Sequence, residues 1–534
     1  MRNLWKTLLL VRQADKGAFR RRVLYVFLQS VLPLTNVYLL KLLIDSLTNG
    51  GGDWSVWLLV MTGVFLLNRI VGALDRVNND VLSQRLTDYM SDIMQRQAAR
   101  LDLAYYDTPS YHDTLHRAQQ EAGNRPLAVL NNAMSVVGAV VSTVIVIGMM
   151  TQVSWWIVLV MIVGVLPSFV VRLHKARSIY GFRRENTQLY RRTAYYGHLL
   201  TSRESAAEMR TLRAAPHFRQ LFVESRARLV KQLLKISRRL GAADVLCGLI
   251  EAVAMLAVIW MLASRTFDQS IGVGSFVMLF EAFRRGQGYM AALVGGIAGL
   301  YDNRLFVGNL FEFLSLKPAL SEPSNPMPVP EQINEVELCD VTFRYPGMNH
   351  DVLSHYNFKA AKGEITLLRG ENGRGKSTVL KLLLRLYDPQ QGSVKMNGID
   401  VRNFSQRQLR VRMGVLFQNF VCYQCTLRDN VALGNAQRYE EDVDMALKMS
   451  GADEVVSRLA NGVETQLGRM FEGGAELSMG QWQRIALARA LQSDAPVLLL
   501  DEPTAWQDPE SRKNFESYLE LLKRDKIIIM VTHT

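Results

Sequence analysis

Gly370-Glu-Asn-Gly-Arg-Gly-Lys-Ser-Thr378 decides the fold of the second half of this chain. The stretch matches G-x-x-x-x-G-K-[ST] and lies between a short predicted strand, 364–368, and an apolar helix predicted at 379–386. In that context, glycines let backbone N–H groups close around phosphate oxygens, and the helix N-terminus favours negative charge. Lys376 would neutralise the outer phosphates, and Ser377 would offer magnesium an oxygen ligand. The candidate ATP-binding residues of this loop are Gly370, Glu371, Asn372, Gly373, Arg374, Gly375, Lys376, Ser377 and Thr378.

A second acidic motif follows a buried strand predicted at Val497–Leu500. That strand ends in Asp501 and Glu502. The aspartate suits a magnesium ion held through water, and the glutamate is positioned to polarise the water that attacks the terminal phosphate. Together with the phosphate-binding loop, this pair predicts ATP hydrolysis with bound Mg²⁺.

The first half of the chain has a different distribution of apolar residues. The 534 residues are 49% hydrophobic, but the long uncharged runs all precede residue 310 or so. A membrane-spanning helix needs about 20 mostly apolar residues. Six segments approach that length, which predicts an all-α membrane domain over residues 1–314. They are residues 23–44, 55–76, 133–150, 153–171, 245–264 and 271–300.

The sixth segment carries the ionisable residues Glu281, Arg284 and Arg285, followed by five glycines between Gly286 and Leu300. Charges at membrane depth are costly and usually face a protein interior or a wet cavity. They are candidates for a translocation path, and the two arginines favour an anionic or amphipathic cargo. The alternative is that the span starts later and that these charges lie at the interface. Weaker candidates, which interhelical hydrogen bonds would explain equally well, are Asn68, Arg69 and Glu251.

Charge placement predicts the topology. The net charge is +13, and basic residues crowd the region before the first apolar run and the long segment from Arg172 to Arg239. Lys and Arg accumulate on the cytoplasmic side of spanning helices, so both termini are expected in the cytoplasm of a multi-pass protein of the plasma or inner membrane. Four cysteines are too few for a disulfide framework, and the Cys422-x-x-Cys425 pair has no partners for a zinc site.

Residues 315–334 join the two halves. The run Ser315–Gln332 contains five prolines, which forbid continued helix and indicate an extended tether. The second domain is therefore predicted at 335–534, with strands at Glu335–Phe343 and Ile527–Val531.

The stretch Leu477-Ser-Met-Gly-Gln481, about 20 residues before Asp501-Glu502-Pro-Thr504, resembles the signature sequence of ABC ATPases. The resemblance covers the whole chain and is to ABC half-exporters of the type IV kind. It implies a membrane all-α six-helix exporter domain followed by an α/β P-loop NTPase domain of the ABC type. It also implies ATP and Mg²⁺ as ligands, and a second half-transporter as partner, with a homodimer expected.

The resemblance assigns further roles residue by residue. Tyr345 resembles the aromatic that stacks on adenine, and Gln418 the glutamine that senses magnesium and the γ-phosphate. His533 matches the switch histidine, which acts with Glu502 and Gln418 in catalysis. Asp508 matches the aspartate of the dimer-contacting loop. The signature residues Leu477, Ser478, Met479, Gly480 and Gln481 would contact ATP bound by the opposite subunit.

The resemblance also implies coupling helices near 109–116 and 203–211 that transmit closure of the ATPase domains to the membrane helices. Three features depart from the pattern. Met479 replaces a glycine, which we expect to be tolerated. Ala505-Trp506-Gln507 precedes Asp508 and is expected to alter contact across the dimer. The chain stops one residue after His533, so the domain is expected to be incomplete at its C-terminus.

The leading hypothesis is ATP-driven export or flipping of a peptide, a lipid or an amphipathic small molecule by alternating access. One alternative is a soluble ABC ATPase that acts on nucleic acid, which the six apolar spans argue against, so nucleic acid is not an expected partner. A second is a membrane-bound regulator that binds ATP without transport, and a third is one half of a heterodimeric drug exporter.

Overall fold

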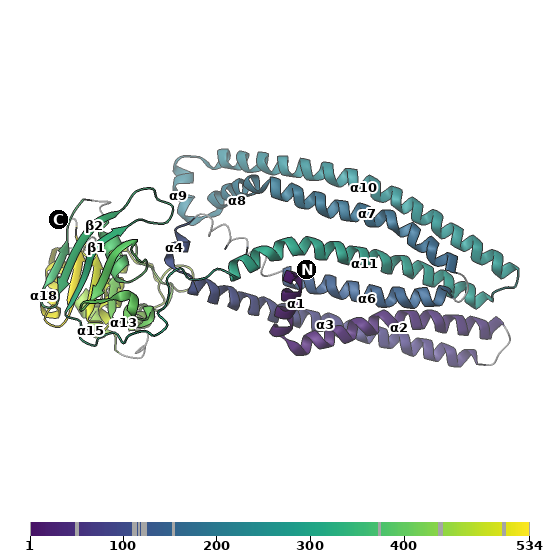
Figure 1. Ribbon diagram of the computed structural model, residues 1–534, viewed down its shortest axis with the longest axis horizontal. Helices are drawn as coiled ribbons and strands as arrows, with labels where there is room; N and C mark the ends of the chain where they lie inside the picture. The colour runs from purple at the N-terminus through teal and green to yellow at the C-terminus, as the bar shows by residue number, and fades with distance from the viewer. Residues whose placement is uncertain are drawn as a thin grey trace. The chain divides into compact units, whose positions relative to one another are not determined.

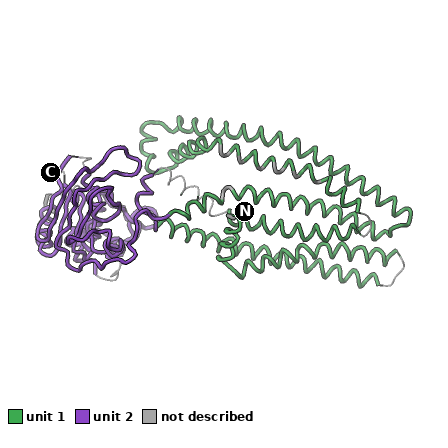
Figure 2. The backbone as a smooth tube through the Cα atoms, in the orientation of Figure 1, with its two compact units in different colours: residues 1–99, 113–316 green, residues 100–112, 317–534 purple. Residues whose placement is uncertain are grey.

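The computed structural model describes residues 2–48, 53–108, 115, 118, 125–151, 155–371, 375–435, 442–504 and 509–532. The chain forms two compact units, which Figure 2 colours separately. One unit comprises residues 1–99 and 113–316, and the other comprises residues 100–112 and 317–534. The second unit therefore includes a short piece taken from the middle of the helical half. The division after residue 316 falls close to the predicted boundary at 314.

The first unit is helical. Each of the six segments predicted to span the membrane falls on one of its helices, namely α2, α3, α6, α7, α10 and α11 (Figure 1), although the predictions 153–171 and 271–300 start two residues before α7 and α11. The helices of this unit are α1 (Arg2–Ala14), α2 (Lys16–Thr48), α3 (Trp54–Arg100), α6 (Arg125–Thr151), α7 (Trp155–Glu185), α8 (Thr187–Thr201), α9 (Arg203–Thr211), α10 (Ala215–Phe267) and α11 (Val273–Leu314).

Four of these helices, α2, α3, α6 and α10, are long and apolar enough to cross a membrane among the described residues, and α7 has a shorter apolar stretch at Trp155–Ser168. α11 is not among them; it carries Glu281, Arg284 and Arg285 and is rich in glycine after them. The longest helices are longer than the hydrocarbon core of a bilayer is thick. At about 1.5 Å per residue, the 53 residues of α10 extend about 80 Å, against a hydrocarbon core of about 30 Å.

Two glycines of the sixth predicted segment have a packing role. α11 lies along α6 (Figure 1), and an added Cβ at Gly296 would lie 2.6 Å from Val136 Cγ2. At Gly299 it would lie 2.5 Å from Asn132 Nδ2. Only a residue without a side chain allows this approach, as in other close helix pairs of membrane proteins. Gly296 and Gly299 are therefore explained by contact between α6 and α11, whereas an added Cβ at Gly288 or Gly295 would meet nothing within 4 Å.

The second unit contains two sheets. An antiparallel sheet has the order β2-β1-β4-β5, and a parallel sheet has the order β3-β8-β7-β6. Its strands are β1 (Glu335–Phe343), β2 (Leu353–Ala361), β3 (Ile365–Leu368), β4 (Gln391–Met396), β5 (Ile399–Asp400), β6 (Met413–Leu416), β7 (Val497–Asp501) and β8 (Ile527–Val531). Its helices are α4 (Leu103–Tyr106), α12 (Lys376–Leu383), α13 (Gln406–Val411), α14 (Leu427–Ala432), α15 (Asp444–Ser450), α16 (Asp453–Val456), α17 (Met479–Gln492) and α18 (Pro509–Leu522).

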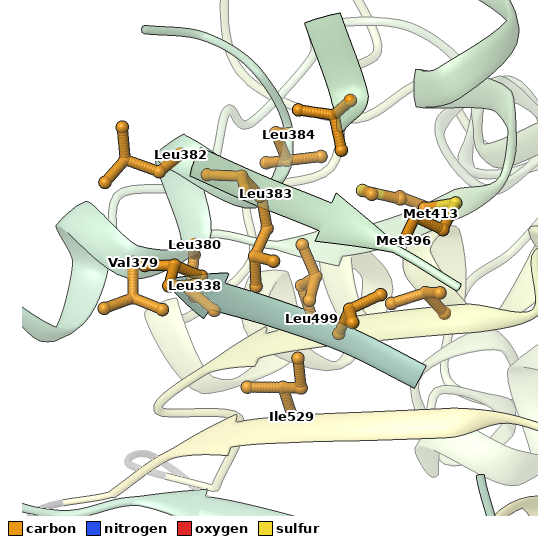
Figure 3. Close-up of a cluster of buried hydrophobic side chains, with 14 of the residues drawn as sticks. Leu338, Val379, Leu380, Leu382, Leu383, Leu384, Met396, Met413, Leu499 and Ile529 are labelled. Atoms are coloured by element: carbon orange, nitrogen blue, oxygen red, sulfur yellow. The ribbon is translucent and has the colours of Figure 1, made fainter. Parts of the chain in front are cut away.

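The core of this unit lies between α12 and the two sheets. α12 buries Val379, Leu380 and Leu383, which pack with Leu499 of β7 and Ile529 of β8 (Figure 3). β7 is buried along its whole length, as its continuous apolar run predicts. Because β3, β7 and β8 are parallel, their carboxyl ends meet at one edge, where the phosphate loop and the acidic pair lie.

The piece Arg100–Thr108 packs on this same core. Leu103 and Ala104 of α4 contact the buried cluster of the second unit. Asp102 accepts hydrogen bonds from the backbone N–H groups of Ala319 and Leu320, and the Tyr105 hydroxyl donates to the Lys317 carbonyl at 2.8 Å. These contacts fix a segment that follows α3 in the chain onto the nucleotide-binding half.

Candidate nucleotide-binding site

The phosphate loop leaves β3 and ends at α12. Its described glycines have left-handed backbone angles, with φ +152° at Gly370 and +80° at Gly375. An added Cβ at Gly375 would lie 2.8 Å from Leu353 Cδ2 and 3.2 Å from the Val352 carbonyl, so both conformation and space require glycine there. Lys376 Nζ donates to the Gly370 carbonyl across the loop. The lysine is therefore folded over the place where phosphate oxygens would bind.

Two oxygen ligands of the expected kind lie together at the strand ends. Ser377 Oγ donates to Asp501 Oδ2 at 2.8 Å, which joins the first turn of α12 to the end of β7. A hydroxyl and a carboxylate are the hard oxygen donors that Mg²⁺ prefers beside nucleotide phosphates. Among the described residues, no three His, Cys, Asp or Glu side chains gather as a metal centre.

Glu502 is held in a defined position. Its backbone is left-handed, with φ +53°, a conformation that costs a non-glycine residue about 1–2 kcal/mol. Its N–H donates to the Val531 carbonyl at 3.1 Å, and its own carbonyl accepts from Gln483 Nε2 at 2.8 Å. Gln418 Nε2 donates to the Glu502 carboxylate at 3.0 Å. The two predicted catalytic residues are therefore in contact.

These residues line one cavity of about 510 Å³. Its wall includes Lys376, Ser377, Gln418, Asp501 and Glu502, with Tyr345 at its border. Tyr345 donates to or accepts from Thr378 Oγ1 at 3.0 Å, and Lys381 Nζ lies 5.0 Å over its ring. The same cavity is thus lined by residues of all four predicted kinds: the adenine-stacking ring, the phosphate loop, the magnesium ligands and the glutamate.

The signature sequence lies at the start of α17, on a different cavity of about 470 Å³. Ser478 is the N-cap of this helix. Its Oγ accepts from the Gln481 N–H, and the Gln481 side chain accepts from the Ser478 N–H at 2.8 Å, which forms a capping box. Met479 is 54% exposed, so a side chain at this position meets solvent rather than protein in this unit. Since the lining of the phosphate cavity includes no signature residue, one unit offers two separate half-sites.

Sequence reasoning missed three residues that support the site. Gln483 is buried in α17 and ties the signature helix to the Glu502 backbone. Tyr387 lies 5.3 Å from Tyr345, ring centroid to centroid, and its hydroxyl donates to the Asp107 carboxylate. Burial, followed by this hydrogen bond, raises the pKa of Tyr387 well above its ordinary value. No local motif marks these three, because their partners lie far away in sequence.

Several predicted residues lie outside the described residues. These are Asn372, Gly373 and Arg374 of the loop, Asp508, His533, and the predicted coupling segment 109–116 except Leu115. The helix that does contact the nucleotide-binding core, α4, precedes that segment. The other predicted coupling segment, Arg203–Thr211, coincides with α9. Glu371 is described and lies in the loop after Gly370.

The charged residues of α11 form one local cluster. Glu281 accepts from Arg284 at 2.9 Å, one turn further along, and lies 3.5 Å from Arg285 Nε. The helix therefore partly neutralises its own charges. Glu251 of α10 accepts from Ser168 Oγ of α7 at 2.6 Å, which supports the interhelical explanation of that residue.

Comparison with known proteins agrees with this architecture. The family model described as the ABC transporter transmembrane region matches residues 23–285, and the model described as ABC transporter matches residues 353–505. The chain belongs to the ABC transporters, as an exporter that joins membrane helices and an ATPase domain in one polypeptide. It is an ATP-binding, multi-pass membrane protein whose ATP hydrolysis drives transport. Exporters of this half-transporter type work as dimers on a transported substrate.

Its relatives include two peptide transporters. It is 25% identical to the subtilin transport ATP-binding protein SpaT of Bacillus subtilis, over 100% of this chain and 88% of that protein. It is likewise 25% identical to the nisin transport ATP-binding protein NisT of Lactococcus lactis, over 99% of this chain and 88% of that protein. The ATP-dependent lipid A-core flippase of Vibrio vulnificus is 31% identical over 57% of this chain and 51% of that protein.

A solved structure shares the fold. A bacterial Atm1-family ABC exporter with ATP bound superposes with a TM-score of 0.78, covering 97% of this chain and 92% of that one, at 20% sequence identity. At this identity the likeness concerns the fold alone. The predicted order of membrane helices followed by an ABC ATPase domain is confirmed.

Proposed function

We propose that this chain forms a homodimer that exports a peptide from the cytoplasm, with ATP hydrolysed at Glu502. The observation that carries the proposal is the pair of separate half-sites on one ATPase unit. The phosphate cavity holds Lys376, Ser377 and Glu502, and the signature residues Ser478 and Gly480 line another cavity. A complete site then needs a second copy, whose signature would close over the first copy's ATP.

Each side chain has a role in hydrolysis. Lys376 leaves the Gly370 carbonyl to neutralise the outer phosphates of ATP. The Glu502 carboxylate accepts a proton from the attacking water, whose oxygen bonds to the γ-phosphorus as the bond to ADP breaks. Ser377, Asp501 and Gln418 would hold Mg²⁺, which supplies charge stabilisation to the phosphates. Tyr345 would stack on adenine.

The contact between Gln418 and Glu502 also bears on when Glu502 can act on water. In this structure the Gln418 amide N–H donates to the Glu502 carboxylate at 3.0 Å and so occupies one of the two groups needed for hydrolysis with the other. If the Gln418 side chain turned to the metal when nucleotide binds, the carboxylate would be released for water. Residues outside the described part, Asp508 and His533, are proposed to act at the dimer contact and as the γ-phosphate switch.

The match to the subtilin and nisin transport proteins, which covers 88% of each of them, supports a peptide cargo. The lipid A-core flippases match a shorter part of the chain, although at higher identity. The Glu281, Arg284 and Arg285 cluster is proposed to face the translocation path. Both termini and the ATPase domain are proposed to lie in the cytoplasm, as the basic flanks of the apolar runs favour.

The test uses inside-out membrane vesicles that contain the full chain, with Glu502→Gln vesicles as control. We expect ATP-dependent accumulation of peptide, identified by mass spectrometry, in the first and none in the second. Accumulation of lipid rather than peptide would overturn the cargo, and equal contents in both vesicles would overturn active export. Mass measurement of the purified complex tests the homodimer, and a different second half would contradict it.

A further inference from the structure

A polar cavity lies within the membrane unit, between four helices. It has a volume of about 270 Å³ and is lined by α2, α3, α6 and α11, which Figure 1 shows running alongside one another. At one end the lining residues are charged or carry amides. At the other they are small or apolar. The polar residues are Arg22, Gln29, Asp75 and Asn131.

The polar end is built around a buried ion pair. Arg22 donates to the Asp75 carboxylate, and their side chains are only 14% and 10% exposed. Gln29 Nε2 donates to the same carboxylate oxygen at 3.1 Å, and Arg22 Nη2 lies 3.4 Å from Asn131 Oδ1. A buried ion pair is costly to maintain and is a weak source of stability. Its presence beside a cavity therefore points to a role other than folding.

Within the described part of the chain, the ion pair leaves two polar atoms without hydrogen-bond partners. Arg22 Nε and Asp75 Oδ1 are buried and have no hydrogen-bond partner among the described residues. Leaving a buried donor or acceptor unpaired destabilises the protein, because the group has given up its hydrogen bonds to water. A ligand that carries both an acceptor and a donor would recover part of that cost after a small movement of either side chain.

The cavity reaches from the membrane edge into the apolar layer. Arg22 immediately precedes the first predicted span, and Asp75 lies at the end of the second. Ser30 and Ser142, at the other end, are joined by a hydrogen bond of 3.1 Å from Ser142 Oγ to the Ser30 carbonyl. The eight residues from Arg22 to Ser30 rise about 12 Å along α2. The apolar walls at that depth come from Val26, Met134 and Ala139.

We propose that this cavity binds an uncharged segment of the exported peptide, with a main-chain amide between Arg22 and Asp75 and an apolar side chain toward Ser30. The inference rests on the proposed peptide export. An amide supplies both a carbonyl acceptor for the guanidinium and an N–H donor for the carboxylate. A phosphorylated headgroup is disfavoured, because Asp75 cancels the charge of Arg22 and would repel the phosphate.

The test measures binding to the full-length protein in lipid nanodiscs. The probe is a capped decapeptide of leucine, alanine and serine with a neutral fluorophore, followed by anisotropy, and lipid A is the competitor. The double variant Arg22→Gln/Asp75→Asn removes both charges and keeps the side-chain shapes. The matched control is Asp92→Asn/Arg96→Gln, an exposed ion pair on the same helix α3.

We expect the double variant to weaken peptide binding about tenfold or more, the factor that one lost charge-assisted hydrogen bond gives. The control should bind as the wild type does. Asp75→Asn alone leaves Arg22 uncompensated, so peptide binding should weaken while lipid A competes more strongly. Gln29→Leu, which removes no charge, should weaken peptide binding several-fold.

Peptide binding that is equal in the wild type, the double variant and Gln29→Leu would overturn the site. Wild-type protein that binds lipid A but not the peptide would overturn the ligand class. Each variant is first checked for a single peak in size exclusion. These outcomes are separable from the proposed function: if the vesicles accumulate peptide with ATP but the binding results fail, only this cavity loses its role.

Discussion

Tyr387→Phe removes one oxygen atom from the second unit. It thereby removes a hydrogen bond that holds the segment Arg100–Thr108 against the core of that unit. The Tyr387 ring is buried, with 4% of its surface exposed, and phenylalanine fills the same space against Phe343 and Tyr345. The change therefore isolates the bond from the Tyr387 hydroxyl to the Asp107 carboxylate.

The free energy of this hydrogen bond is set by the negative charge on its acceptor, the Asp107 carboxylate. A hydrogen bond to a charged group contributes about 1.5–3 kcal/mol, and about 1.4 kcal/mol is a factor of ten in an equilibrium. Without it, the piece is held by Leu103 and Ala104 and by the bonds of Asp102 and Tyr105. Local opening of residues 103–108 should become about 10- to 150-fold more populated.

Hydrogen exchange followed by mass spectrometry on the full-length protein reads this opening directly. The amides of Tyr105 and Thr108, which donate to the Asp102 and Tyr105 carbonyls, should exchange faster by that factor. The control is Tyr356→Phe in β2, a half-buried tyrosine whose hydroxyl has no hydrogen bond among the described residues; exchange at 103–108 should stay unchanged. Equal exchange in Tyr387→Phe and wild type, with the α12 and β7 amides intact, would refute the reasoning.

Three further predictions follow from the same structure. Glu502→Gln should retain ATP binding but lose hydrolysis by about 10²–10⁴-fold, measured as phosphate release; normal turnover would remove the general-base role. Gly375→Ala should weaken ATP binding about tenfold or more, because its φ of +80° and the nearby Leu353 side chain exclude a Cβ, and filter binding with labelled ATP would reveal an unaffected loop. Burial raises the pKa of the Cys422 thiol, so iodoacetamide should modify it slowly at pH 7 and faster as the pH rises through that elevated pKa; rapid labelling at pH 7 would contradict this.

The raised pKa of Tyr387 determines how its contribution to stability changes with pH. The folded state disfavours the phenolate, so this tyrosine's contribution to stability is complete below its unfolded value of about 10 and is lost as the pH rises through the higher folded value. Once the intrinsic base-catalysed exchange rate of each amide is divided out, Tyr387→Phe should remove that alkaline dependence from the protection of residues 103–108. A dependence that persists in the variant would assign it to another group.

Local patterns were sufficient for much of the second unit. The strand Glu335–Phe343 and the strand Ile527–Val531 have the predicted bounds, because alternating and continuous apolar runs report burial directly. The helix after the phosphate loop begins at Lys376 rather than at Val379, since its first turn is polar and serves the ligand. Ser377 and Asp501 were both predicted, and the structure adds that they touch.

Contacts between distant residues could not be predicted. Arg22 was counted among the basic residues that flank the first span, and nothing in the sequence links it to Asp75, 53 positions later. In the same way, Asp107 lies between two predicted membrane helices, 280 positions from Tyr387. Charge periodicity identifies neighbours on one helix, such as Glu281 and Arg284, but tertiary pairing depends on how whole helices pack.

The attachment of α4 limits how this polypeptide can be divided. A fragment made by cutting in the proline-rich tether would begin near Lys317 and would leave Leu103 and Ala104 behind, so the apolar surface they cover would meet water. Such a fragment would be prone to self-association, whatever the quality of its phosphate loop. An autonomous ATPase fragment would need residues 100–108 grafted back onto it, for example ahead of Lys317 on a flexible glycine–serine linker.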